Sequence, residues 1–193
     1  MTDQGVPSTY RCLPFPRLED RGFSLRAVQQ SDIEPIRQWR NAQIGVLRQA
    51  EPISEDAQNA YFAREIWPTL DKAQPRNILL AFSEGYRLIG YGGLVHVAWE
   101  HRRAEVSFLL EPEMERDRDA FSACFATYLG MIKELAFRGL GFHRLVTETF
   151  DIRPAVVAAL EQAGFRLEGR MRDHVMIDGT PTDSLIHGCL DND

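Results

Sequence analysis

The sequence is short of positive charge, and almost none of that charge comes from lysine. Its 193 residues include 22 Lys and Arg against 28 Asp and Glu, which gives a formal net charge of -6. Lys72 and Lys133 are the only lysines in the chain. A protein that binds nucleic acid or an anionic membrane surface needs a basic face. We therefore expect no nucleic-acid partner.

Cysteine is also scarce, and long hydrophobic runs are missing. Cys12, Cys124 and Cys189 are odd in number and have no metal-ligand spacing, which is typical of buried thiols in a reducing compartment. We expect no metal cofactor. The start of the chain lacks the charged segment and apolar run of a signal peptide, and no apolar run is long enough to span a bilayer. These features favour a cytoplasmic protein with no membrane partner.

The chain does contain enough apolar material for one folded domain. Hydrophobic residues make up 44% of it, and its length is that of a single domain. Residues 1–20, which include Pro7, Pro14 and Pro16, are predicted to form an irregular lead-in. The domain itself is expected over residues 21–193.

Hydrophobic periodicity predicts the order of the elements. Apolar residues recur on one helical face over residues 121–136, whereas residues 77–110 alternate as strands. Ser31 and Glu34 match a capping box, and Ser54 matches an N-cap. An α/β fold follows, with a mixed sheet of about seven strands and about four helices. The strands are expected at residues 23–28, 77–83, 87–99, 103–110, 143–150, 165–177 and 182–190.

Six strings in this order resemble the GNAT acetyltransferase superfamily. They are "LRAVQQSDIEPIRQWRN", "LIGYGGL", "AEVSFLL", "LAFRGLGFHRLVTETF", "LEQAGFRLEGRMR" and "IDGTPTDSLIHGCL". The resemblance is to the branch that contains ribosomal-protein alanine N-acetyltransferases and nucleotide-sugar amine acetyltransferases. It implies a single-domain GNAT-like fold and direct transfer of an acetyl group from acetyl-CoA to a primary amine. The amine would belong to a small molecule, such as an amino sugar, or to a peptide N-terminus. A homodimer stays open.

The resemblance also implies where acetyl-CoA binds. In the family it lies where the fourth and fifth strands separate, and its pantetheine arm hydrogen-bonds to the backbone of the fourth strand, here Phe108, Leu109 and Leu110. Its pyrophosphate sits on a Q/R-G-x-G-x-A loop at the N-terminus of the next helix, where unsatisfied N–H groups and glycine let the backbone approach a phosphate.

That glycine loop is absent from this chain, which has no glycine between Gly93 and Gly130. Counting forward from the fourth strand places the loop on residues 115–120, and counting back from the next helix places it on residues 120–125. About five residues are therefore inserted.

Three interpretations of the altered junction stay open. In the first, the start of the helix still binds the pyrophosphate, and Arg116 or Arg118 adds charge. In the second, the loop is reshaped and the cofactor binds differently; in the third, the site is lost and the protein is a non-catalytic GNAT-fold binding or regulatory protein. The acidic residues here also fit a solvated loop in which Asp117 or Asp119 caps the helix. Arg153, before the following helix, either reaches a phosphate or ribose or lies on the surface.

Three residues are candidates for proton transfer in such a reaction. Glu105 lies at the family's carboxylate position on the fourth strand and is the first choice of general base, although it could instead pair with Arg102 or Arg103. Glu148 on the fifth strand is the second choice, with a buried salt bridge as the alternative. His96 has a side chain that relays protons near neutral pH, although a lone strand histidine is more often structural.

The acceptor amine is expected near the end of the first helix. The resemblance places Trp39, Arg40 and Asn41 there, and Tyr91 on the third strand is a further candidate substrate residue. A tryptophan at helical spacing is more often part of the core. His187 and Asp183 match the family's closing string and are expected to be fold elements.

Overall fold

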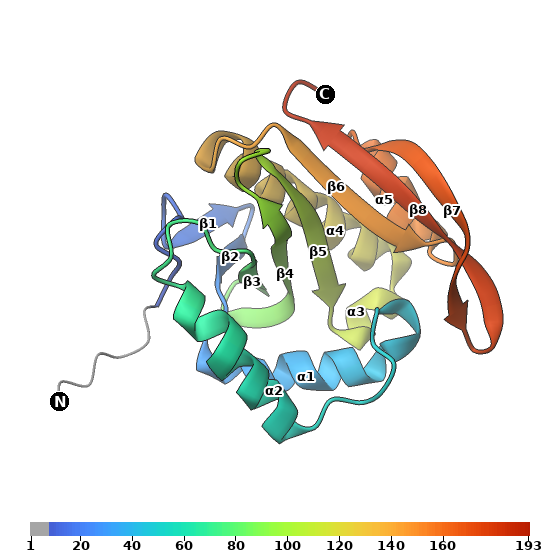
Figure 1. Cartoon of the computed structure of the whole chain (residues 1–193), viewed down its shortest axis with the longest axis horizontal. Coiled ribbons are helices and arrows are strands. Elements are labelled where there is room, and N and C mark those ends of the chain that lie inside the picture. Colours follow the sequence, from blue (N-terminus) through green and yellow to red (C-terminus); the bar gives the residue numbers. More distant parts are fainter. Residues whose placement is uncertain (1–7) are drawn as a thin grey trace.

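A single eight-stranded sheet forms the centre of the molecule (Figure 1). The computed structural model describes residues 8–193, and only the backbone at positions 115, 116, 118 and 119. The spatial order of the strands is β1-β2-β3-β4-β5-β6-β8-β7, and β5 and β6 are parallel to each other. The strands are β1 Arg17–Asp20, β2 Phe23–Ala27, β3 Ile78–Glu84, β4 Arg87–Ala98, β5 Arg103–Leu110, β6 Arg144–Phe150, β7 Arg166–Ile177 and β8 Thr180–Leu190.

The α/β fold with a mixed sheet is confirmed, with one strand more than predicted. The additional strand is β1, which pairs with β2 and lies inside the stretch that was expected to be an irregular lead-in. A domain boundary at residue 20 stays a prediction. The helices are α1 Ile33–Ala42, α2 Glu55–Tyr61, α3 Pro112–Arg116, α4 Arg118–Lys133 and α5 Pro154–Gln162.

The sheet carries a hydrophobic core on each face. Successive residues of β3 show this, because Leu80 and Phe82 belong to one core while Leu79 and Ala81 belong to the other. Helices α4 and α5 cover the first face, and α1 and α2 cover the second (Figure 1). The predicted apolar stripe of α4 is confirmed: Phe121, Cys124, Phe125, Tyr128, Leu129 and Ile132 are all buried.

The helix starts are partly as predicted. Ser54 caps α2, because its Oγ accepts a hydrogen bond from the Ala57 N–H at 3.2 Å. The capping box expected from Ser31 and Glu34 is wrong. Asp32 takes that place, accepting the Gln29 N–H at 2.8 Å. Its carboxylate is held there by Arg26 at 2.6 and 2.9 Å.

The two parallel strands at the middle of the sheet separate after a short contact. β5 and β6 pair only through Arg103–Glu105 and Arg144–Val146. The rest of β5 continues to pair with β4, and the rest of β6 with β8. The sheet therefore opens into a wedge between β5 and β6, which begins immediately after Glu105.

Candidate active site at the opening of the sheet

Two carboxylates face each other across the start of this wedge. Glu105 on β5 pairs with Val146 on β6, and Glu148 lies two residues further along β6, so both side chains are on the α1 and α2 face. Arg48 joins them: its Nη2 donates to Glu105 Oε1 and to Glu148 Oε2, each at 2.8 Å. The carboxylate side chains are mostly buried, with exposed fractions of 21% and 16%.

His96 completes this cluster because the strand that carries it is irregular. The β4 register shifts between Val95 and Ala98, and His96 has φ of +49°. A residue other than glycine is uncommon in this conformation. The bulge brings His96 Nδ1 to 2.9 Å from Glu105 Oε2. On the other side of the cluster, His174 Nε2 lies 3.6 Å from Glu148 Oε1.

The structure thus brings together the three residues that the sequence singled out for proton transfer. Glu105, Glu148 and His96 form one network, which we call the carboxylate cluster, together with Arg48 and His174. Glu105 is paired neither with Arg102 nor with Arg103 in the ion pairs of the described residues. Such a cluster can accept a proton at a carboxylate and pass it to solvent through an imidazole that is half exposed.

Sequence reasoning missed Arg48 and His174. Arg48 lies in the irregular segment between α1 and α2, 57 residues from Glu105 and 100 from Glu148. His174 lies beside an irregularity in the closing hairpin, where the register shifts between Met171 and Val175. No periodicity or motif marks either position, because their contacts depend on the tertiary fold alone.

The wedge itself holds a narrow cavity of about 60 Å³. Phe108 and Thr147 line it from β5 and β6, and Arg153 lines it from the residue before α5. Thr147 Oγ1 is buried and has no hydrogen-bond partner in the part of the chain that the structure describes. An unpartnered hydroxyl in a wedge of unpaired strand edges suits a ligand that supplies polar groups along its length, as the pantetheine arm of acetyl-CoA does.

The three residues of β5 whose backbone is predicted to bind the pantetheine arm differ in their surroundings. Phe108 lines the wedge, and its ring stacks on Phe125 with centroids 4.7 Å apart. The side chains of Leu109 and Leu110 are buried in the two cores. The Leu110 carbonyl already accepts a hydrogen bond from Gln43 Nε2 at 2.8 Å. Of the three, Phe108 is therefore placed best to meet a ligand in the wedge.

The junction after β5, where the sequence predicts an insertion, forms a helical turn of its own. Helix α3 spans Pro112–Arg116, and α4 starts two residues later. Asp117 caps α4, since its Oδ1 accepts the Ala120 N–H at 3.1 Å. One of the N–H groups that would meet a pyrophosphate is therefore occupied by a carboxylate. The side chains of Arg116 and Arg118, predicted to bind phosphate, lie outside the described residues.

A larger cavity of about 350 Å³ lies under α1 and α2, and we call it the α1–α2 pocket. Ser107 and Val95 line its sheet side, next to Glu105, and Tyr91 lines it further along β4. Arg40 reaches in from α1 and donates from Nη1 to the Tyr91 hydroxyl at 2.7 Å. Burial raises the pKa of the Tyr61 phenol, which also lines the pocket, although the Arg40 charge acts the other way.

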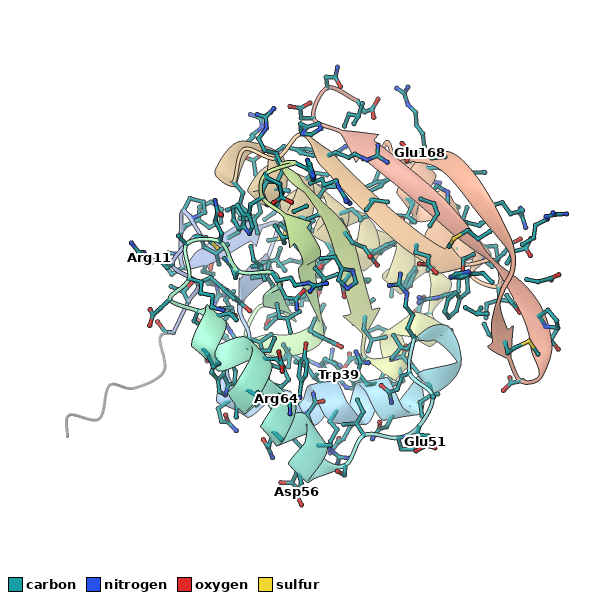
Figure 2. All side chains as sticks on the ribbon, viewed as in Figure 1. Arg11, Trp39, Glu51, Asp56, Arg64 and Glu168 are labelled. Carbon is teal, nitrogen blue, oxygen red and sulfur yellow. The ribbon has the colours of Figure 1, made fainter. Side chains whose placement is uncertain are left out.

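The other predicted substrate residues lie beside this pocket. Asn41 supports the segment between α1 and α2: its Nδ2 donates to the Ile53 carbonyl and its Oδ1 accepts the Ile53 N–H, both at 2.8 Å. Trp39 is on α1 and packs partly against the core beneath that helix (Figure 2). Tyr91 is thus the predicted substrate residue that lines the α1–α2 pocket.

Comparisons with known proteins match most of the chain. The family model described as "Acetyltransferase (GNAT) domain" matches residues 25–186. An uncharacterised N-acetyltransferase of Bacillus subtilis, YoaA, is 30% identical over 190 residues, which is 91% of this chain and 97% of that protein.

Solved structures of the same fold include the spermidine/spermine N-acetyltransferase SpeG of Vibrio cholerae. Mutant forms of it match with a TM-score of 0.75 at 22% identity, over 90% of this chain and 96% of that chain. The complex of that spermidine N-acetyltransferase with CoA and spermine matches with a TM-score of 0.76 at 19% identity, over 90% and 98%.

Within residues 8–193, the structure has no helix that is long and apolar enough to cross a membrane. The described residues also contain no group of three or more His, Cys, Asp and Glu side chains arranged to hold a metal ion.

Proposed function

Because the chain belongs to the GNAT acetyltransferase family and is an acyl-CoA-dependent N-acetyltransferase, we propose that it transfers the acetyl group directly to a primary amine beside Glu105. The observation that carries this proposal is the position of Glu105. It is the last residue of β5 that pairs with β6, so it stands where the wedge begins, and its partner on β4 is Val95, which lines the α1–α2 pocket. Glu105 therefore lies between the sites proposed for the two substrates.

In this proposal the wedge holds acetyl-CoA. Phe108 and Thr147 would contact the pantetheine arm. Arg153, which precedes α5, would contact a phosphate or the ribose. When bound, acetyl-CoA supplies the acetyl group as an activated thioester. Leu109, Leu110, Arg116 and Arg118 remain proposed contacts for the same ligand.

Glu105 acts as the general base for the amine. An amine is a nucleophile only after its ammonium form loses a proton, and a carboxylate within hydrogen-bond reach can take that proton. His96, 2.9 Å from the same carboxylate and half exposed, passes the proton on to solvent. Glu148 is the second carboxylate. Its negative charge continues to attract a cation while Glu105 is protonated.

The acceptor proposed from the resemblance is an amino sugar or a peptide N-terminus. The SpeG structures add spermidine and spermine, which are also primary amines, as compounds to test. Trp39, Asn41 and Tyr91 stay proposed residues of the acceptor side.

Glu105→Gln tests the proposal. We expect the variant to lower kcat by about 100-fold, the scale of general-base catalysis, in an assay of CoA thiol release. Glu65→Gln, an exposed carboxylate after α2 that pairs with Arg64, is the matched control and should keep full activity. Thermal unfolding of both variants checks that the fold is intact.

Two results would contradict this assignment. Full turnover by Glu105→Gln together with loss in Glu148→Gln would move the base to β6. Absence of both binding heat and thermal shift with millimolar acetyl-CoA would remove the wedge as the cofactor site.

A further inference from the structure

The α1–α2 pocket has a cation at one end and carboxylates next to its other end. From this we infer that the acceptor is an amine that also carries a carboxylate, with the two groups separated by several bonds. Arg40 would bind the carboxylate and Glu105 would receive the amine. The inference rests on the proposed function and specifies its substrate class.

Arg40 has no acidic partner in the part of the chain that the structure describes. Its Nε donates to Gln49 Oε1 at 3.0 Å and its Nη1 to the Tyr91 hydroxyl at 2.7 Å, and both of these partners are neutral. Nη2 makes no hydrogen bond to a described residue. A guanidinium that is held in place by neutral groups keeps its outer edge for a planar anion, and a carboxylate fits that edge with two parallel hydrogen bonds.

None of the described residues that line the pocket is acidic. Arg40 is charged, and the neutral polar side chains of the lining are those of Gln58, Tyr61, Tyr91 and Ser107. A diamine or polyamine would place a second ammonium group against Arg40, with no carboxylate there to offset the repulsion between like charges. An anionic group at that end would instead pair with Arg40. The charge of the pocket therefore favours amino carboxylates over diamines and polyamines.

The pocket also offers the side-chain amide of Gln58, close to aromatic rings. Gln58 on α2 is only 4% exposed and makes no side-chain hydrogen bond among the described residues. Phe62 and Tyr91 flank the same space. An amide that faces the pocket without a protein partner can bind a ligand, and an amide or hydroxyl in the body of the acceptor would pair with it. The body would otherwise be apolar.

The register of the sheet sets the distance between the two ends. Val95 pairs with Glu105, whereas Tyr91, the contact of Arg40, pairs with Leu109. Four residues of β5 span about 13 Å along the strand. The Arg40 and Tyr91 side chains extend into the pocket, so the acceptor has to bridge a somewhat shorter gap than this. A free α-amino acid, whose amine and carboxylate share one carbon, is too short to bridge the ends, whereas a short peptide or a long ω-amino acid is long enough.

The reaction balances without a further reagent. The acceptor ammonium gives one proton to Glu105, and its nitrogen forms a bond to the acetyl carbon as the bond from that carbon to sulfur breaks. The second proton that nitrogen sheds goes to the sulfur. The products are an N-acetylated amino carboxylate and CoA.

A matched set of acceptors tests the inference. The compounds are 8-aminooctanoate, 1,8-diaminooctane and octylamine, which differ only in the group at the far end, with 4-aminobutanoate and norleucine as short-span comparisons. For the wild type we expect kcat/KM in the thiol-release assay to be highest for 8-aminooctanoate. It should exceed the value for the diamine by about 10-fold or more, the scale of one charge-assisted hydrogen-bonded pair.

The Arg40→Gln variant distinguishes a loss of carboxylate recognition from a loss of folding. We expect it to lower kcat/KM for 8-aminooctanoate by about 10-fold or more while octylamine changes by less than about 3-fold. The matched control is Arg64→Gln, at an exposed arginine that follows α2 and pairs with Glu65, and it should change neither value (Figure 2). Calorimetry of 8-aminooctanoate binding without acetyl-CoA should show the same loss of affinity in Arg40→Gln.

The outcomes distinguish this inference from the proposed function. Equal or better turnover of 1,8-diaminooctane by the wild type overturns the inference but leaves the transferase intact. So does an equal loss for 8-aminooctanoate and octylamine in Arg40→Gln. If no amine releases CoA, the proposed function fails. Calorimetry then decides the inference alone, and wild-type protein that does not bind 8-aminooctanoate overturns it.

Discussion

Arg48 gives the carboxylate cluster its geometry. Its guanidinium lies at 2.8 Å from both Glu105 and Glu148, and it offsets the repulsion between these two negative charges. An acceptor ammonium carries the same charge and is attracted to the same oxygens. The cluster is therefore arranged to hold a cation before any substrate enters, and Arg48, nearly half exposed, is free to turn toward solvent when the substrate takes that place.

His187 is a buried histidine on the opposite face of the sheet. It is fully buried, and neither ring nitrogen has a hydrogen-bond partner among the described residues. Burial lowers its pKa, and the charges of Glu161 and Glu168 offset this only in part. In the unfolded chain the histidine titrates near its ordinary pKa of about 6.5. As the pH falls through that value, the unfolded state takes up the proton first, so the stability of the native state decreases.

The pH dependence of unfolding therefore reports on His187. We expect the wild type to lose up to about 1.4 kcal/mol per pH unit from this residue below pH 6.5 or so, as measured by urea unfolding at pH 7.5, 6.5 and 5.5. His187→Gln should remove that part of the slope. His101→Gln, at an exposed histidine, should keep the wild-type slope. Equal slopes in all three proteins would show that His187 stays neutral in both states at these pH values.

At the scale of elements, the junction between β5 and α4 is where the sequence lacks the glycine loop that the resemblance implies. Helix α3 occupies this junction, and Asp117 caps α4 through the Ala120 N–H. A carboxylate at a helix start occupies the end of the dipole that attracts anions. The cap that stabilises α4 would therefore compete with a pyrophosphate bound at this helix start.

Asp117→Ser tests that competition, because serine caps a helix about as well as aspartate but carries no charge. We expect the Kd for acetyl-CoA to fall by about 2- to 5-fold at low ionic strength, with a smaller change at high salt. Calorimetry measures both. Asp191→Ser is the control, since Asp191 lies with Lys133 at the other end of α4. An unchanged Kd at low salt would place the pyrophosphate away from this helix start.

At the scale of the whole molecule, the fold followed from the sequence more fully than the site did. Strands β3 to β6 and the buried face of α4 match their predicted positions closely, because alternation and helical periodicity are local signals. Glu105, Glu148 and His96 were chosen one at a time, and their meeting depends on the register of three strands.

The parts that the sequence did not predict depend on contacts between distant segments. Arg48 is placed by the path of the segment after α1, and the φ of +49° at His96 by a bulge in β4. Asp32 replaced the expected capping box because Arg26 on the neighbouring strand holds it. The resemblance places Arg40 near the acceptor, but its hydrogen bond to the Tyr91 hydroxyl depends on how α1 packs on β4.

We propose that the two substrates meet beside Glu105, one from the wedge and one from the α1–α2 pocket. A crystal structure of the protein with CoA and 8-aminooctanoate would show whether they do. We expect the CoA sulfur to lie at the opening between β5 and β6, and the amine nitrogen within hydrogen-bond reach of Glu105, about 3 Å. An amine bound away from Glu105, or CoA bound outside the wedge, would contradict the account.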